Sequence, residues 1–303
     1  DIDLAHDLGH DSSRGSRSAG RDFDICDGAI LAVNKKFFVG IGVQKCASTW
    51  LYDILRDHPE VALSNRKEVD FFSYNFGSGY QWYENQFPED AQGRVLGEIS
   101  PSYFVDANVP ERVLAYAPDA KVIVSLRDPV ERAISNHRHE VRIGNFFGAD
   151  LSFEAGLRNN PLYVEQSRYG KHLTRWLTHF PASRLMIVFQ EDIETNPGGV
   201  ARNVYRFLEV DADHVSSAVD GRSNESHVYR FDALERMRRA TRGAIRALGI
   251  EGAWRAGQRA GLQTLYRRLN RRPPSLRIPP ITHETRAHLC RLLESDIHMV
   301  EEI

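Results

Sequence analysis

Residues 37–51 read FFVGIGVQKCASTWL, an apolar run followed by a short loop of small and polar residues and then the start of a helix. The apolar run is typical of a buried strand. A helix that begins directly after such a turn leaves several backbone N–H groups unpaired and directed at one place. Lys45, Ser48 and Thr49 add an ammonium and two hydroxyls to the same loop. We therefore expect this segment to bind a phosphate or sulfate group.

The loop differs from the P-loop of nucleoside triphosphatases, which reads G-x-x-x-x-G-K-[ST]. Gln44 precedes Lys45 here, and Cys46 follows it in place of the hydroxyl that would ligate magnesium. This difference disfavours a kinase-like phosphotransferase. Taken alone, the pattern also fits a strand, turn and helix whose lysine is merely solvated. A helix N-terminus lowers the pKa of a nearby thiol, so Cys46 is either a nucleophile or, as we favour, a residue that occupies a small-residue position.

A second strand and helix follow in residues 121–141, which begin KVIVSLRDPVERAIS. The apolar run predicts a buried strand, and Asp128-Pro129 predicts the start of a helix. Arg127 at the end of the strand and Ser135 two helical turns later can reach one phosphate at the carboxyl edge of a parallel sheet, where open α/β folds bind ligands. The alternative is an ion pair between Arg127 and Asp128 beside a polar helix face.

Together, the two segments resemble the donor site of sulfotransferases that use 3′-phosphoadenosine 5′-phosphosulfate. Residues 45–51, KCASTWL, are similar to the 5′-phosphosulfate loop K-x-G-[ST]-[ST]-x-L, and residues 126–135, LRDPVERAIS, are similar to the 3′-phosphate segment. Residues 67–72, KEVDFF, and 97–104, GEISPSYF, resemble the K-E-[VP]-x-F-F and E-K-[ST]-P-x-Y-F stretches of heparan sulfate-type sulfotransferases and their bacterial relatives. The resemblance runs in register over residues 37–210.

The resemblance implies an α/β fold in one domain, with a P-loop-like central parallel β-sheet flanked by helices. It implies in-line transfer of a sulfuryl group, without a metal, to a hydroxyl or amine of a carbohydrate, lipid or natural-product acceptor. Residues 221–230, GRSNESHVYR, resemble the loop that folds over the adenosine and the 3′-phosphate in relatives. The donor-binding residues expected from the resemblance are Gln44, Lys45, Cys46, Ala47, Ser48, Thr49, Trp50, Arg127, Ser135, Arg222 and Arg230.

Glu68, at the glutamate position of the K-E-[VP]-x-F-F stretch, is the general base that the resemblance implies. The acceptor must lose a proton as it bonds to sulfur, and a carboxylate desolvated by the neighbouring Phe71 and Phe72 has a raised pKa. Without the resemblance, an exposed pair of Lys67 and Glu68 is the simpler interpretation.

Ile99 stands where the carbohydrate enzymes often carry a second catalytic lysine. Lys45 is therefore expected to act alone or with a residue of the helix around residues 129–143, which holds Arg138 and two histidines. His137 and His139 lie two positions apart and so face different sides of that helix. We expect one of them to face the reacting centre and name His139 as the catalytic candidate.

Composition and charge limit the remaining possibilities. The chain has 303 residues and a formal net charge of −2, which gives no general attraction to nucleic acid or membranes. Three cysteines show neither metal-ligand spacing nor a disulfide framework. No run of 18 apolar residues is present, so the chain as given is not expected to span a membrane. Because it begins with Asp, we expect a processed or excised chain. The sequence favours a cytoplasmic, bacterial-type location and leaves open a luminal domain of a Golgi-type enzyme.

Residues 1–36 are expected to form a mobile polar arm and residues 37–303 the sulfotransferase domain, with a core at 37–210 and a C-terminal helical part that includes the donor-covering loop. Residues 230–272 hold twelve arginines against three acids, which suggests a solvated helix face or a contact with an anionic acceptor or carrier protein. Six aromatic residues in 74–87 fit either an acceptor cleft for a glycan or small molecule, or the core. A kinase-like phosphotransferase and a catalytically silent carbohydrate-binding protein of the same fold are the alternative functions.

Overall fold

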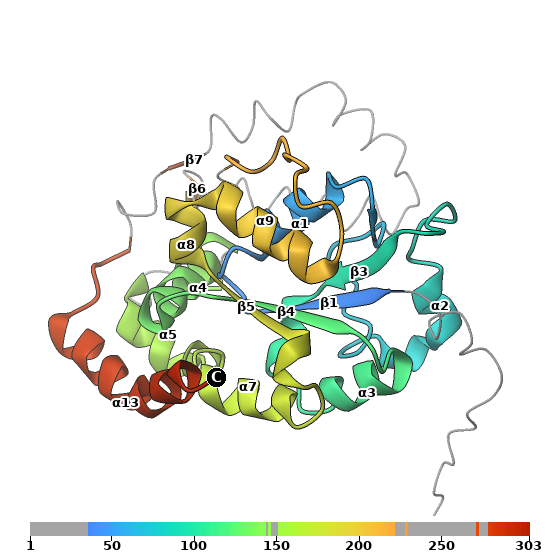
Figure 1. Cartoon of the computed structure of the whole chain (residues 1–303). Coiled ribbons are helices and arrows are strands. Elements are labelled where there is room, and N and C mark those ends of the chain that lie inside the picture. Colours follow the sequence, from blue (N-terminus) through green and yellow to red (C-terminus); the bar gives the residue numbers. More distant parts are fainter. Residues whose placement is uncertain (1–35, 144, 147–150, 222–227, 230–270, 273–277) are drawn as a thin grey trace, which may run out of the picture.

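The computed structural model describes residues 36–143, 145–146, 151–221, 228–229, 271–272 and 278–303. A five-stranded parallel sheet with the strand order β2-β3-β1-β4-β5 lies at the centre (Figure 1). Its strands are β1 (Phe37–Gly42), β2 (Val61–Leu63), β3 (Val95–Ile99), β4 (Lys121–Leu126) and β5 (Leu185–Phe189). The sheet confirms the predicted α/β fold class.

The middle strand β1 marks the point where the chain changes direction across the sheet. The chain leaves β1 towards β2 and β3 on one side, whereas it leaves β4 towards β5 on the other. β1 and β4 are neighbours, with Val39 paired to Val122. In open parallel sheets, ligands bind outside the carboxyl ends of two strands related in this way. The topology therefore locates the expected site beyond Gly42 and Leu126.

Side chains of β1 alternate between two hydrophobic clusters, one on each face of the sheet. Phe37, Val39 and Ile41 pack with α7 (Tyr169–Leu177), η2 (Pro101–Phe104) and α3 (Val109–Tyr116). Phe38 packs on the other face with α1 (Ser48–Arg56) and α9 (Pro197–Leu208). Figure 1 shows α1 and α9 above the sheet and α3 and α7 below it. Burial on both faces explains why all six residues of β1 are apolar or glycine.

The remaining described elements lie around this frame. They are η1 (Phe76–Ser78), α2 (Tyr80–Glu84), α4 (Pro129–Ile143), α5 (Phe153–Asn159), α6 (Leu162–Glu165), η4 (Ala182–Arg184), α8 (Gln190–Thr195), the antiparallel pair β6 (Val228–Tyr229) and β7 (Arg271–Arg272), and α13 (His283–Glu301). Among the aromatic residues of 74–87, Tyr83 is fully buried in the core and Tyr74 is 80% exposed. None of the helices in the described ranges is long and apolar enough to cross a membrane.

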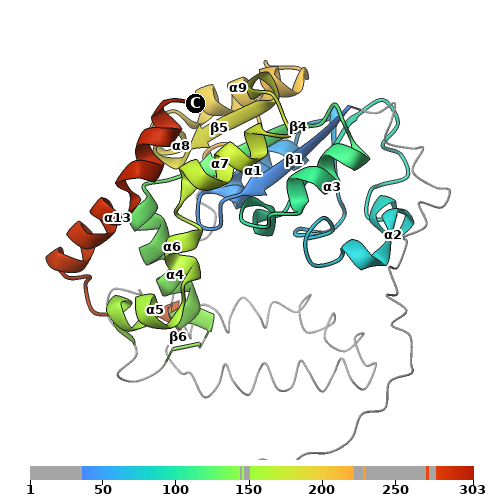
Figure 2. The same cartoon turned by 90° about the horizontal axis from the view of Figure 1, so that it is seen from below.

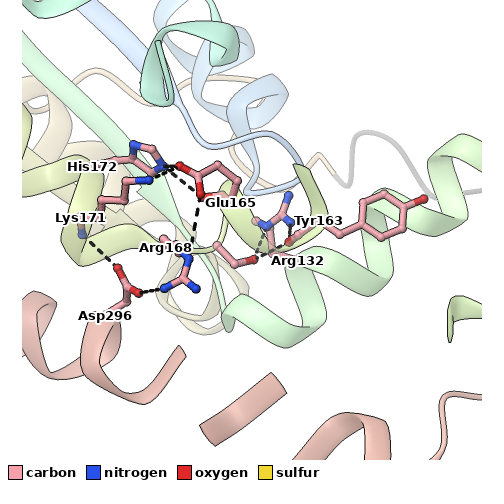
Figure 3. Close-up of polar contacts among 8 residues, drawn as sticks. Arg132, Tyr163, Glu165, Arg168, Lys171, His172 and Asp296 are labelled. Atoms are coloured by element: carbon pink, nitrogen blue, oxygen red, sulfur yellow. Dashed lines mark hydrogen bonds and ion pairs between the residues drawn. The ribbon is translucent and has the colours of Figure 1, made fainter. Parts of the chain in front are cut away.

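The C-terminal helix α13 packs along α7 and α4, at one edge of the molecule in Figure 2. Asp296 on α13 is buried and accepts hydrogen bonds from the backbone N–H of Lys171 at 3.0 Å and from Arg168 at 3.2 Å (Figure 3). Gly170 lets the helices approach, since a Cβ there would lie 2.6 Å from Met299 Cβ. A buried charge that is paired and hydrogen-bonded fixes the position of α13 against the core.

Candidate active site

The loop between β1 and α1 is held by β4 and has an open helix N-terminus. The backbone N–H of Val43 donates to the carbonyl of Ser125 at 2.8 Å, and the Ser125 hydroxyl donates to the carbonyl of Gly42 at 3.0 Å. Gly42 has φ +124°, which favours glycine, and Lys45 and Ala47 adopt left-handed conformations. The N-cap residue of α1, Ala47, supplies no side-chain acceptor, and the first turn carries no acidic residue. The N-terminus of α1 is therefore a place where an anion can bind.

A cavity of about 800 Å³ lies at this loop. All predicted site residues in the described part of the chain line it, except Cys46. Those lining residues are Gln44, Lys45, Ala47, Ser48, Thr49, Trp50, Glu68, Arg127, Ser135 and His139. Arg222 and Arg230 lie outside the described residues, as do most of the N-terminal arm, of the donor-covering loop and of the basic stretch. Residues far apart in the sequence thus meet at the predicted edge of the sheet.

Arg127 and Ser135 form the wall of the cavity at the end of β4. The Arg127 side chain is 24% exposed, and its Nη2 atom lies 4.0 Å from Glu131 Oε2. Arg286 of α13 forms a second ion pair with Glu131. Asp128 caps α4, because its Oδ1 atom accepts from the Glu131 N–H at 2.7 Å. The polar groups at the strand end are therefore arranged with Arg127 facing the cavity and Asp128 bound to the helix.

Glu68 enters the cavity from the loop after β2. Burial raises the pKa of the Glu68 carboxyl above its ordinary value, and the neighbouring charge of Lys67 partly opposes this. Lys67 Nζ donates to Thr49 Oγ1 at 3.0 Å, which joins the Glu68 segment to the first turn of α1. A carboxylate with a raised pKa beside a group of cations is typical of a general base.

Comparison with known proteins decides the family. Residues 36–230 match the sulfotransferase domain. This chain belongs to the sulfotransferase domain family. It is 36% identical over 176 residues to heparan sulfate glucosamine 3-O-sulfotransferase 3A1 of Mus musculus, an alignment that covers 55% of this chain and 44% of the relative. It is 32% identical over 192 residues to bifunctional heparan sulfate N-deacetylase/N-sulfotransferase 2 of Homo sapiens, covering 57% and 22% of the two chains.

A crystal structure of a sulfotransferase from Alicyclobacillus acidocaldarius is similar in fold. It has a TM-score of 0.54 and 26% sequence identity, and the match covers 64% of this chain and 86% of the bacterial one. This chain thus spans less than half the length of the two curated relatives, whereas the match covers 86% of the bacterial chain. These matches confirm the predicted family.

Lys45 has the electrostatic environment expected for an anion-binding lysine. Burial lowers the pKa of the Lys45 ammonium to about 8, and the nearby charge of Arg142 adds to this effect. Lys45 is therefore mostly charged at neutral pH, and a bound anion would raise its pKa again. A partly desolvated cation also interacts more strongly with a phosphate than one in water does.

The structure resolves the choice between the two histidines. His137 is buried between the Tyr163 hydroxyl at 3.2 Å and the Leu151 carbonyl at 3.0 Å, away from the cavity. His139 lines the cavity, and burial together with Lys45 and Arg142 lowers its pKa to about 4. Its Nδ1 atom faces an N–H of Arg142, so the ring proton of the neutral histidine is assigned to Nε2. His139 is thus a neutral hydrogen-bond donor rather than a base.

Cys46 does not have the lowered pKa that a helix N-terminus could give it. Its side chain is fully buried beneath the loop, with Sγ 3.7 Å from the Tyr169 hydroxyl, and burial raises the pKa of the thiol to about 12. The nearby charge of Arg132 opposes this shift but does not overcome it. The nucleophilic interpretation is therefore wrong, because only the thiolate is a good nucleophile. The interpretation of Cys46 as a small residue required by packing agrees with its position.

Arg132 supports the loop from behind and was missed by the sequence analysis. It is fully buried on α4, and its N–H groups donate to Ser167 Oγ at 2.7 Å and to Gln166 Oε1 at 3.0 Å. Arg132 also donates to the Tyr163 carbonyl (Figure 3). Gln166 in turn donates to Gln44 Oε1 at 3.4 Å. Because these acceptors are neutral oxygens, the positive charge of Arg132 adds to the potential that attracts an anion to the loop.

Other cavity residues were also missed. Arg142 follows Ser135 and His139 at helical spacing on α4, so periodicity alone could have identified it. The lining residues that lie after β5 have no such signal, because they are far from the predicted loops in the sequence. Trp50 Nε1 donates to the Val219 carbonyl at 2.9 Å. The other residues that line the cavity are Pro101, Glu140, Gln190, Ile193, Glu194, Pro197, Val219, Asp220 and Gly221.

Proposed function

We propose that this protein transfers a sulfuryl group from 3′-phosphoadenosine 5′-phosphosulfate to a hydroxyl or amine of an acceptor, with a carbohydrate favoured over a lipid or other natural product. The observation that carries this proposal is that Lys45, Arg127 and Glu68 line one cavity, of about 800 Å³. Its size is in the range of pockets for nucleotide-sized ligands. The heparan sulfate relatives support the carbohydrate acceptor.

The donor fits the charges and shapes of the cavity. The 5′-phosphosulfate would accept hydrogen bonds from amides within residues 44–50 and from the hydroxyls of Ser48 and Thr49. The Cys46 N–H is not among these donors, because it donates to the Val43 carbonyl at 3.2 Å. The 3′-phosphate would bind Arg127 and Ser135, and the adenine would pack on Trp50. A donor without the 3′-phosphate loses the contacts with Arg127 and Ser135, which explains the expected preference for the doubly phosphorylated nucleotide.

The reaction is a direct in-line transfer. The acceptor oxygen or nitrogen bonds to sulfur while the bond from sulfur to the bridging phosphate oxygen breaks, and the electron pair of that bond stays on the phosphate. Glu68 accepts the acceptor proton, and Lys45 stabilises the charge that grows on the leaving oxygen. His139, a neutral N–H donor, contributes to the same stabilisation. Positioning and fixed donors suffice for this transfer, so we expect no requirement for a metal.

Radiolabelled sulfate transfer tests the proposal. The purified chain is incubated with the ³⁵S-labelled donor, EDTA and one of three acceptors: heparan sulfate oligosaccharides, a glycolipid or a phenol. We expect label in the oligosaccharides, and a loss of at least about 100-fold in turnover for Glu68→Gln. Full turnover of Glu68→Gln would refute the assignment of the base. No transfer to any acceptor, together with magnesium-dependent binding of ATP, would favour the phosphotransferase instead.

Two further expectations remain predictions. One concerns the basic stretch, most of which lies outside the described residues, and the other concerns the location of the protein in the cell. The arginines of residues 230–272 are proposed to attract an anionic acceptor or an acidic carrier protein. The cytoplasm is the proposed location. Sedimentation with and without heparan sulfate, and localisation of the tagged native chain, would test them.

A further inference from the structure

Glu98 is a buried carboxylate that lies outside the cavity. It is fully buried on β3, the strand next to β1. Its Oε1 atom accepts hydrogen bonds from the hydroxyls of Tyr103 at 2.6 Å and Tyr83 at 2.9 Å, and its Oε2 atom accepts from the Ser100 hydroxyl at 2.7 Å. An ionised carboxylate in the core requires such donors, because burial without them is very unfavourable.

Two of these three hydroxyls also bind the segment that carries Glu68. Ser100 Oγ accepts the backbone N–H of Asp70 at 2.9 Å, and the Tyr103 hydroxyl accepts the backbone N–H of Phe72 at 3.1 Å. A hydroxyl has a single proton. Because Ser100 and Tyr103 donate theirs to Glu98, their lone pairs are left to accept from the segment. Ser100 and Tyr103 are thus hydrogen-bonded bridges between Glu98 and residues 69–72, and the carboxylate fixes the direction of the hydrogen bonds in both.

The backbone at Asp70 indicates that this segment is held in place. Asp70 has φ +53°, a left-handed conformation that is unfavourable for a residue with a side chain and persists only where the surroundings impose it. Its Oδ1 atom accepts from the Ser102 hydroxyl at 2.6 Å, in addition to the bond that its N–H donates to Ser100. The turn two residues after Glu68 is therefore fixed by residues 100–103, which follow β3.

We propose that Glu98 is a positioning residue for the transfer reaction: through Ser100 and Tyr103 it holds residues 69–72 and so fixes Glu68 at the cavity wall. This inference rests on the proposed role of Glu68 as the base. Glu98 itself does not touch the substrates in this proposal. A base that shifts by about an ångström loses alignment with the acceptor proton, so loosening the bridges lowers kcat without weakening donor binding.

The two tyrosines that donate to Oε1 provide a matched pair of variants. Tyr103→Phe removes one donor to Glu98 and also the acceptor of the Phe72 N–H, whereas Tyr83→Phe removes only a donor to the same oxygen. Both side chains are fully buried. Tyr103→Phe should lose more stability than Tyr83→Phe, because it also leaves the Phe72 N–H without its acceptor. With both variants folded at the assay temperature, a difference in kcat between them reports the loss of this hydrogen bond to the Glu68 segment.

The assay is transfer of ³⁵S-sulfate to heparan sulfate oligosaccharides at pH 8. Burial raises the pKa of Glu98 to about 7, and pH 8 lies above this value, so Glu98 is largely ionised in the assay. We expect kcat to fall roughly 10- to 100-fold for Tyr103→Phe and by less than about twofold for Tyr83→Phe. The dissociation constant of adenosine 3′,5′-bisphosphate, from calorimetry, should stay within about twofold for both. Ser100→Ala, which removes the other bridge, should behave as Tyr103→Phe does and serves as the test if Tyr103→Phe does not fold.

Equal values of kcat for Tyr103→Phe and Tyr83→Phe would overturn the inference, as would a loss of donor affinity that matches the loss of kcat. Glu68→Gln in the same assay separates this failure from a failure of the proposed function. If Glu68→Gln abolishes transfer while the two tyrosine variants are equal, only the positioning role of Glu98 is refuted. If Glu68→Gln turns over normally, the assignment of the base fails, and the inference fails with it.

Discussion

Removal of the Arg127 guanidinium should weaken binding of the donor product only when that product carries its 3′-phosphate. Arg127 lines the cavity with a side chain that is 24% exposed, and Glu131 lies 4.0 Å away as its anionic partner. A charge-assisted bond from arginine to phosphate contributes about 1.5–3 kcal/mol. Since Arg127 must partly exchange Glu131 for the phosphate, we expect the lower end of this range, a loss of roughly 10- to 30-fold in affinity.

Isothermal titration calorimetry measures this with two nucleotides and two variants. Arg127→Ala should raise the Kd of adenosine 3′,5′-bisphosphate by that factor and change the Kd of adenosine 5′-phosphate by less than about twofold. Arg138→Ala is the control, because Arg138 is an exposed arginine on α4, the helix that follows Arg127, and lies outside the lining of the cavity. Equal losses for both nucleotides, or a comparable loss for Arg138→Ala, would refute the assignment of Arg127 to the 3′-phosphate.

Three further results are expected. Arg286→Ala should weaken the binding of adenosine 3′,5′-bisphosphate two- to fivefold, because Glu131 loses its second cation and holds Arg127 more strongly. The double variant with Glu131→Gln should recover the affinity in calorimetry, and a double variant without recovery would contradict this role of Arg286. Iodoacetamide at pH 8 should modify the exposed Cys290 and leave the buried Cys46 unmodified, as measured by peptide mass spectrometry. Equal labelling of the two cysteines would contradict the raised pKa of the Cys46 thiol. Folding raises the pKa of Glu98 from 4.5 to about 7, so the folded state binds this proton more tightly than the unfolded state does. As pH rises from 4.5 to 7, the free energy of unfolding should therefore fall relative to that of Glu98→Gln, by at most about 3 kcal/mol. Urea titrations that show a constant difference between the two proteins would contradict this prediction.

The parts of the fold that the sequence predicted are those with strong local signals. The apolar runs at residues 37–42 and 121–126 predicted β1 and β4, and each was followed by a helix start that the structure confirms. Because parallel strands share one carboxyl edge, these two segments were enough to predict that Lys45 and Arg127 would meet. Both residues line one cavity.

The parts that the sequence could not predict depend on the direction of side chains and on partners far along the chain. His137 and His139 could not be separated, since the sequence does not show which face of α4 packs on α5 and α6. Cys46 was assigned a possible lowered pKa because its place in the loop was known but its burial was not. Glu98 was recognised only within a motif, because one of its partners, Tyr83, lies on another element.

A crystal structure with adenosine 3′,5′-bisphosphate tests most directly whether the two loops bind opposite ends of one nucleotide. We predict the 5′-phosphate at the N-terminus of α1, within hydrogen-bond distance of Lys45 and Ser48, and the 3′-phosphate on Arg127 and Ser135. Glu68 should then face the outer side of the 5′-phosphate, where the sulfuryl group would stand. A nucleotide bound in the reverse direction, or outside this cavity, would contradict the assignment of the donor site.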